Sequence, residues 1–316
     1  MNKPPLIILT GPTAAGKTEL SIQLAKKING EIISADSMQV YKGMDIGTAK
    51  ITKEEMQGVP HHLIDILNPE EEFNVMLFKE KADACIQDIY SRKKIPIIAG
   101  GTGFYIQAVL YDICFTKEET DKTYRKELEV LAREKGADVL HGMLKEVDEK
   151  SAASIHPNNV KRVIRALEYY HETKETMSSH NETERLRSSP YTFSYYVLTM
   201  DRDVLYQRID ERVDLMIKRG LVEEVRSLYE KGYAKELVSM QGLGYKELYR
   251  YFAGELTLEE AVYIIKRDTR HFAKRQLTWF RREKEVTWID KGAFNGEEEL
   301  LAHMLRDLKE KHIINE

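Results

Sequence analysis

The chain has 316 residues and a formal net charge of −4, from 48 Lys and Arg against 52 Asp and Glu, and 42% of its residues are hydrophobic. This length predicts one large α/β domain or two smaller ones, and the composition excludes a disordered chain and a polycation that binds nucleic acid indiscriminately. The two cysteines, Cys85 and Cys114, form no C-x-x-C pair. This excludes a disulfide scaffold and a cysteine-rich zinc site and favours a reducing compartment.

The first apolar run, residues 6–9, is too short for a signal-peptide core or a membrane span, and no later run approaches spanning length. We therefore expect a cytoplasmic protein with no membrane partner.

The first hundred residues alternate between short apolar runs and segments with helical periodicity. The runs at residues 6–9, 31–36 and 95–99 predict buried strands. Residues 20–28 and 78–89, between them, carry apolar side chains at helical spacing. This order predicts an α/β fold, a P-loop doubly wound parallel sheet with helices on both faces.

After about residue 115 the sequence pattern changes to charged segments with helical periodicity. No further strand is expected before residues 195–198. We interpret residues 117–190 as a mostly helical insertion domain. Its polar tail, residues 178–190, is expected to be a loop. The α/β core domain then comprises residues 1–116 and 191–316.

The last third of the chain is again expected to be helical. An apolar stripe over residues 205–216 is stopped by Gly220. Thr257 and Glu260 form a capping box before a long helix that is expected to run toward Lys284.

Residues 11–18, Gly-Pro-Thr-Ala-Ala-Gly-Lys-Thr, match the phosphate-binding pattern G-x-x-x-x-G-K-[ST] between a predicted strand and a predicted helix. Backbone N–H groups would converge on phosphate oxygens, Lys17 would add a charge and Thr18 would orient Mg²⁺. The alternative is an ordinary glycine turn. The loop predicts a bound di- or triphosphate but leaves open whether a phosphoryl group is transferred or a diphosphate departs. The predicted diphosphate contacts here are Gly11, Thr13, Ala14, Ala15, Gly16, Lys17 and Thr18.

Asp36 follows the second predicted strand and should face the same crevice as Lys17 and Thr18, because ligands bind at the carboxyl ends of parallel strands. It could be a Mg²⁺ ligand, a general base or a turn cap. Asp65 and Asp201 could also complete a nucleotide site, although apolar strands often end in Asp for turn chemistry.

Three basic faces stand out. Arg208, Arg212 and Arg219 form a stripe that is either a solvated face or a clamp on leaving phosphates. Residues 161–165 form a second face. Residues 266–284 form a third, with aromatic residues interleaved, which suits RNA but also fits a helix with a solvated side.

Several segments together resemble the bacterial-type tRNA dimethylallyltransferases, also called tRNA isopentenyltransferases. The block Asp-Ser-Met-Gln-Val-Tyr-Lys-Gly-Met-Asp-Ile-Gly-Thr-Ala-Lys at residues 36–50 is long and unlike a kinase signature. The other matching segments lie at residues 11–18, 100–105, 156–168, 242–245 and 274–279. The resemblance covers essentially the whole chain.

The resemblance implies transfer of a dimethylallyl group from dimethylallyl diphosphate to the exocyclic amine of the tRNA adenine immediately 3′ of the anticodon. It makes Asp36 the general base, and Lys17 and Thr18 the diphosphate and Mg²⁺ contacts. It makes Arg212, with Arg208 beside it, a further diphosphate contact. Mg²⁺ is the expected cofactor, the anticodon stem-loop and dimethylallyl diphosphate are the expected partners, and a monomer is expected. The implied tRNA contacts are Asp36, Ser37, Met38, Gln39, Thr102, Arg125, Lys161, Arg162, Arg165, Gln241, Gly242, Gly244, Tyr245, Lys246, Arg275, Gln276, Trp279 and Arg282, several of them in the insertion domain.

Two other functions fit parts of the sequence. The phosphate-binding loop alone would fit an ATP-dependent nucleotide or small-molecule kinase, and the basic faces would fit an RNA-binding protein with a nucleotide switch.

Overall fold

The computed structural model describes residues 3–115 and 122–314, and the chain divides into two compact units. The core unit comprises residues 1–110 and 190–316, and the helical unit comprises residues 111–189. The sequence placed the second boundary between residues 190 and 191. The predicted first boundary, between residues 116 and 117, lies outside the described residues.

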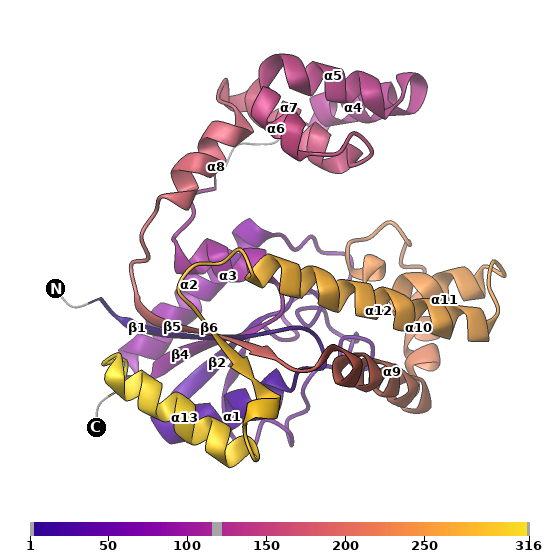
Figure 1. Cartoon of the computed structure of the whole chain (residues 1–316). Coiled ribbons are helices and arrows are strands. Elements are labelled where there is room, and N and C mark those ends of the chain that lie inside the picture. Colours follow the sequence, from indigo (N-terminus) through magenta and orange to yellow (C-terminus); the bar gives the residue numbers. More distant parts are fainter. Residues whose placement is uncertain (1–2, 116–121, 315–316) are drawn as a thin grey trace. The chain divides into compact units, whose positions relative to one another are not determined.

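The core unit contains a six-stranded parallel sheet in the order β3-β2-β4-β1-β5-β6 (Figure 1). The strands are β1 (Pro5–Thr10), β2 (Gly30–Ala35), β3 (His61–His62), β4 (Ile95–Gly100), β5 (Thr192–Thr199) and β6 (Val286–Asp290). The α-helices are α1 (Lys17–Ile28), α2 (Val75–Ser91), α3 (Gly103–Leu110), α9 (Arg202–Lys218), α10 (Leu221–Glu230), α11 (Tyr245–Phe252), α12 (Leu258–Phe280) and α13 (Glu297–Glu310). Two short 3-10 helices cover Ser239–Gln241 and Lys291–Ala293.

Helices lie on both faces of this sheet, with α1 and α13 on one and α2 and α3 on the other (Figure 1). The central strands are buried because both faces are covered, which explains the apolar runs in β1 and β4. The predicted fold class, a P-loop doubly wound sheet with a helical insertion, is confirmed. The sequence prediction omitted β3, β6 and α13, and it carried the helix at Thr257 beyond Phe280, where α12 ends.

The helical unit consists of five described helices packed around an apolar cluster that includes Leu128, Leu140, Leu144 and Val163. The helices are α4 (Lys122–Lys135), α5 (Ala137–Val147), α6 (Glu149–Ser154), α7 (Val160–Thr173) and α8 (Met177–Arg185).

The expected loop at residues 178–190 was wrong over its first half, which belongs to α8. The sequence of α8 is polar, and its first turn is stabilised by an N-cap. The Thr176 side chain accepts a hydrogen bond from the Ser179 N–H. The Asp148 carboxylate also accepts one from the Ser178 N–H at 2.9 Å. Both contacts satisfy amides that a helix start leaves unpaired.

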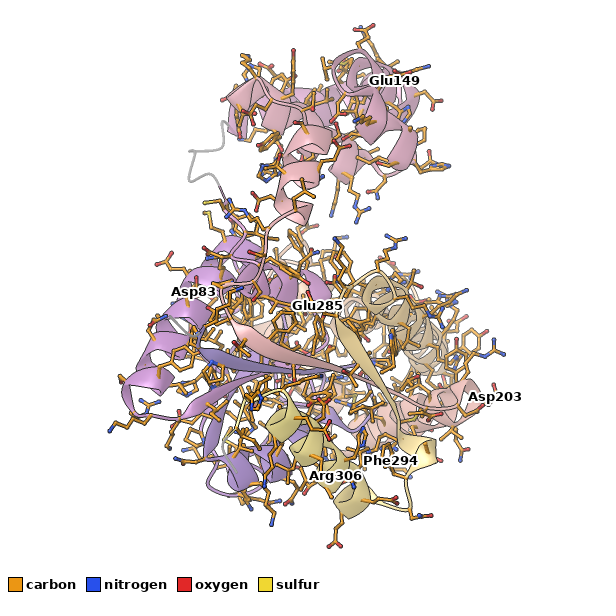
Figure 2. All side chains as sticks on the ribbon, turned by 60° about the vertical axis from the view of Figure 1, so that its left-hand side comes forward. Asp83, Glu149, Asp203, Glu285, Phe294 and Arg306 are labelled. Atoms are coloured by element: carbon orange, nitrogen blue, oxygen red, sulfur yellow. The ribbon has the colours of Figure 1, made fainter. Side chains whose placement is uncertain are left out.

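Exposed acidic side chains occupy the first turns of several helices, among them Glu149 in α6 and Asp203 in α9 (Figure 2). Their charge is favourable there because it complements the positive end of the helix dipole. Within the described residues, no helix combines the length and the apolar character that a membrane span requires.

Candidate active site

The phosphate-binding loop joins β1 to α1, and its backbone requires glycine. Gly11 has φ 145°, and a Cβ there would lie 2.7 Å from the Leu198 carbonyl oxygen. Gly16, at φ 83°, caps α1 in the left-handed conformation. The Lys17 ammonium group donates to the carbonyl oxygens of Gly11 at 3.0 Å and Pro12 at 2.8 Å. The Lys17 side chain therefore folds back over the loop and binds its backbone.

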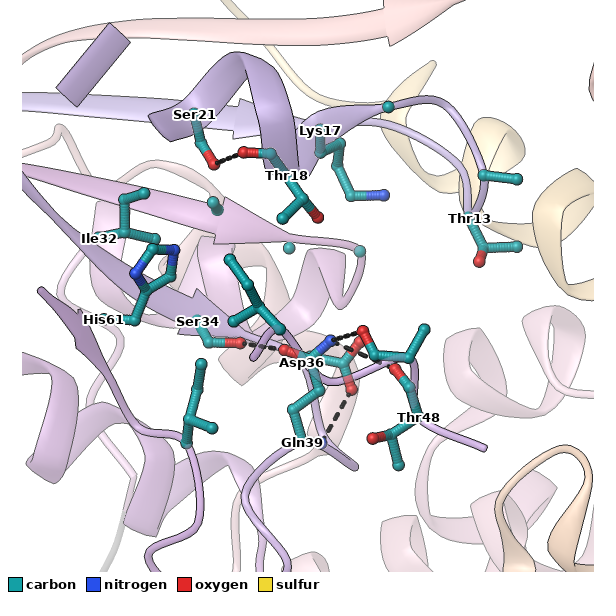
Figure 3. Close-up of a pocket in the computed structure, with 18 of the residues that line it drawn as sticks. Thr13, Lys17, Thr18, Ser21, Ile32, Ser34, Asp36, Gln39, Thr48 and His61 are labelled. Carbon is teal, nitrogen blue, oxygen red and sulfur yellow. Dashed lines mark hydrogen bonds between the residues drawn. The ribbon is translucent and has the colours of Figure 1, made fainter. Parts of the chain in front are cut away.

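A cavity of about 150 Å³ opens beside this loop (Figure 3). Its wall is formed by residues from the loop, the ends of β2 and β4, the segment after β2, and helices α9 and α12. The predicted site residues in its wall are Thr13, Ala14, Gly16, Lys17, Thr18, Asp36, Gln39, Arg212 and Gln276. Residues separated by up to 263 positions thus meet at the carboxyl edge of the sheet, where ligands bind in folds of this kind.

Asp36 faces this cavity and also caps a turn. Its Oδ1 accepts hydrogen bonds from the backbone N–H groups of Met38 at 2.8 Å and Gln39 at 3.3 Å. Its Oδ2 accepts none from any residue that the structure describes. The capping and cavity-facing interpretations are therefore compatible, because one oxygen fixes the carboxylate and the other is left for a ligand.

The positive charges of Lys17 and Arg212 are held in the same cavity. Burial lowers the pKa of the Lys17 ammonium group from 10.5 to about 8, the charge of Arg212 acts in the same direction, and Asp36 opposes both. Burial also lowers the pKa of Arg212, again opposed by Asp36. Two cations beside one carboxylate leave an excess of positive charge, which is the electrostatic requirement for binding a diphosphate.

Two more cations approach Gly16 from outside the loop. A Cβ on this glycine would lie 3.8 Å from the Arg208 guanidinium and 2.8 Å from the Lys291 ammonium group. Arg208 was predicted here. Lys291, which pairs with Glu297 at 2.9 Å, was missed because it follows a strand that the sequence did not reveal.

Gln276 links two of the loops that form the site. Its side chain accepts a hydrogen bond from the Thr13 N–H and donates one to the Gly101 carbonyl oxygen, both at 2.9 Å. The side chain is only 6% exposed, so it organises the cavity. Trp279, one turn later, packs against Gly103, where a Cβ would lie 2.2 Å from the indole ring.

The segments around residues 36–50 and 241–246 pack together. A Cβ on Gly242 would lie 2.7 Å from the Met38 methyl carbon, and one on Gly47 would lie 2.6 Å from the Tyr245 ring. Tyr245 is 1% exposed. These predicted tRNA-contacting blocks therefore share a packed interface beside the cavity.

The other predicted tRNA contacts of the core unit lie in several environments. Half-buried Thr102 donates its N–H to the Ala35 carbonyl oxygen at 3.2 Å. Exposed Gln241 donates its side-chain amide to the Lys235 carbonyl oxygen. The remaining positions are half-buried Ser37 and Lys246, Gly244 at φ 93°, and exposed Arg275 and Arg282.

In the helical unit, Lys161, Arg162 and Arg165 are exposed on α7. Arg125 has a structural partner, because its guanidinium makes two hydrogen bonds, of 2.7 and 2.5 Å, to the buried carboxylate of Glu168.

The basic face of residues 266–284 is partly neutralised by α9. Lys266 lies 2.7 Å from the Asp214 carboxylate, and Arg270 lies 2.5 Å from that of Asp210. Of the other acids considered from the sequence, Asp201 caps α9 and Asp65 pairs with Lys50 at 2.5 Å.

The described residues contain no cluster of three or more His, Cys, Asp or Glu side chains that could hold a metal ion by themselves. Mg²⁺ does not need one when a substrate supplies phosphate oxygens and water fills the remaining positions. Thr18 and Asp36 line one cavity, so the donors present suit a Mg²⁺ ion carried on a diphosphate.

Comparison with known proteins shows the family. The IPP transferase family model matches residues 39–283. The tRNA dimethylallyltransferase of Lachnoclostridium phytofermentans is 61% identical over 310 residues, covering 98% of this chain and 99% of the relative. The crystal structure of full-length tRNA isopentenylpyrophosphate transferase from Bacillus halodurans is 47% identical, covers 98% of each chain and has a TM-score of 0.74.

A eukaryotic dimethylallyltransferase, crystallised acting on tRNA, is 30% identical, with a TM-score of 0.81 over 97% of this chain and 80% of that chain. The resemblance drawn from the sequence motifs is thereby confirmed. The chain belongs to the IPP transferase family, the prenyltransferase family that includes these tRNA dimethylallyltransferases.

Proposed function

We propose that the protein transfers a dimethylallyl group from dimethylallyl diphosphate to the exocyclic amine of the tRNA adenine immediately 3′ of the anticodon. The observation that carries the proposal is that Asp36 shares one cavity with the phosphate-binding loop and Arg212. A carboxylate and a diphosphate cradle must face the same space if one is to take a proton while the other retains the leaving group.

The loop amides, Lys17 and Arg212 would hold the diphosphate, with Arg208 beside them. As the allylic C–O bond breaks, its electron pair passes to the diphosphate oxygen, and these fixed positive groups stabilise the growing charge. Mg²⁺, held by the diphosphate and the Thr18 hydroxyl, would supply further charge neutralisation. The apolar side chains of Ile32, Ile51 and Ile64 in the cavity wall suit a short hydrocarbon.

The adenine amine would form the new C–N bond to the electron-deficient allylic carbon. It would then lose a proton to Asp36, whose Oδ1 is fixed by two backbone amides. A carboxylate is a weak base, but it suffices when the proton leaves after the new bond has acidified the amine. The adenine must leave the anticodon stack to reach it, which costs a few kcal/mol.

The tRNA would be held by the block at residues 36–39 near the cavity and by exposed cations on α7 and at the end of α12. With tRNA as its substrate, the protein is expected to act in the cytoplasm. We expect a monomer to suffice, because the proposed catalytic residues all come from one chain.

A single assay tests the proposal: unmodified tRNA is incubated with the protein, labelled dimethylallyl diphosphate and Mg²⁺, and the tRNA is digested to nucleosides. We expect label on the amine of the adenine next to the anticodon. ATP turnover without labelled tRNA would support a kinase instead. Binding of tRNA without either reaction would support a non-catalytic RNA-binding protein.

A further inference from the structure

One carboxylate, that of Glu224 on α10, receives four hydrogen bonds from two distant segments. Its Oε2 accepts from the backbone N–H groups of Asp45 at 2.8 Å and Ile46 at 2.7 Å. Its Oε1 accepts from the Gly47 N–H at 3.1 Å and from the Tyr245 hydroxyl at 2.6 Å. Three consecutive backbone amides on one charged group form an anion-binding nest that the protein fills itself.

The segment held by Glu224 leads directly to the cavity. The carbonyl oxygens of Thr48 and Ala49 accept hydrogen bonds of 3.3 and 3.4 Å from the side-chain amide of Gln39. The amide oxygen of Gln39 accepts another from the Ser34 hydroxyl at 3.1 Å, and its backbone N–H donates to Asp36 (Figure 3). Two sets of hydrogen bonds, joined by the covalent backbone of residues 45–49, therefore connect Glu224 to the proposed base.

Among the described residues, no other charged side chain accepts hydrogen bonds from the backbone N–H groups of residues 45–47, although Lys50 pairs with Asp45 at 2.6 Å and Asp65 at 2.5 Å. Gly47 approaches the Tyr245 ring so closely that a Cβ would overlap it, so the backbone at residues 45–47 is already in contact with the helix behind it. Hydrogen bonds to a charged acceptor are roughly twice as strong as neutral ones. An amide in place of the carboxylate would also present N–H donors to the N–H groups of the nest.

We propose that Glu224 is a positioning residue for prenyl transfer, which holds Asp36 in the cavity through the backbone of residues 45–49 and the side chain of Gln39. The proposal rests on the proposed function, and it assigns to α10 the placement of the base, while α9 carries Arg212 for the diphosphate.

The test compares Glu224→Gln with Glu223→Gln, which removes the same charge from the same helical turn at an exposed position outside the nest. Single-turnover prenyl transfer is measured with both substrates saturating, and the affinities for tRNA and dimethylallyl diphosphate are measured separately. We expect Glu224→Gln to slow transfer about 100-fold, as a displaced catalytic group does, with both affinities changed less than about threefold. Glu223→Gln should match the wild type, and Glu224→Asp should fall between the two.

Coupling to Gln39 distinguishes positioning from a general loss of stability. If Glu224 acts through Gln39, the Glu224→Gln/Gln39→Ala double variant should be about as slow as the slower single variant. Combining Glu224→Gln with Arg208→Ala should instead multiply the two effects. Multiplicative losses with Gln39→Ala, or a wild-type transfer rate in Glu224→Gln, would overturn the inference while leaving the proposed function intact. Failure of the wild-type enzyme to label tRNA would overturn both.

Discussion

The buried ammonium group of Lys17 makes diphosphate binding depend on pH in a window that the structure defines. With a pKa of about 8 in the free protein, Lys17 is about 90% protonated at pH 7 and about 10% protonated at pH 9. A bound diphosphate favours the protonated form, so its binding raises this pKa. The affinity for the diphosphate is therefore highest below pH 8, where the free protein carries a mostly protonated Lys17. It falls as the pH rises from 8 toward the pKa of Lys17 in the complex.

The expected magnitude is about a tenfold weaker affinity at pH 9 than at pH 7, because one protonation carries the effect. Calorimetric titration with dimethylallyl diphosphate, without tRNA, measures it. The ligand's own ionisation is removed by dividing each affinity by that of Lys17→Met at the same pH. Lys17→Arg, which stays charged throughout, should give a flat ratio.

Arg212 provides a second check on the cause. Its charge lowers the pKa of Lys17, so Arg212→Gln should move the midpoint of the pH dependence above 8. A wild-type ratio that stays constant from pH 7 to pH 9.5 would refute the argument that burial and Arg212 together depress the pKa of Lys17.

Three further predictions concern the surroundings of the site. The affinity for tRNA should fall steeply with salt, and Arg165→Ala should reduce by about one the slope of the log association constant against the log salt concentration. A flat slope in binding titrations would contradict a phosphate-binding surface. Arg125→Ala should lower the stability of the helical unit by about 1–3 kcal/mol in urea unfolding, because it leaves the buried Glu168 carboxylate without its partner; unchanged unfolding would contradict this role. Gly101→Ala places a Cβ 2.1 Å from the side-chain amide of Gln276 and should weaken dimethylallyl diphosphate binding about 5- to 10-fold, whereas an unaltered affinity would show that Gln276 is dispensable to the cavity.

The elements with local signals could be predicted from the sequence. The strand, loop and helix at residues 5–28 carry apolar runs, fixed glycines and helical spacing within one short segment. Two strands were missed because they lack such signals. β3 contains two residues, and β6 has one buried residue, Ile289, beside the exposed Trp288.

The structural roles of Gln276 and Glu224 could not be predicted, because their partners are far away in the sequence. The family resemblance implied Gln276 only as a tRNA contact, and nothing in the basic pattern around it indicates that its side chain turns inward to Thr13. Glu224 is one of many acids on charged helices. Its backbone partners lie 177 to 179 positions earlier, and only the packing of α10 against the segment after β2 brings them together.

The central claim is that the Asp36 carboxylate accepts the proton of the adenine amine in the cavity where the diphosphate is held. Single-turnover transfer by Asp36→Asn, with tRNA affinity measured on the same preparation, tests it most directly. Asn keeps the size of the side chain and an oxygen that can accept from the Met38 N–H, but it cannot take the proton. We expect Asp36→Asn to lower the transfer rate about 10²- to 10⁴-fold while its tRNA affinity stays near that of the wild type. Near-normal transfer by Asp36→Asn would contradict the central claim.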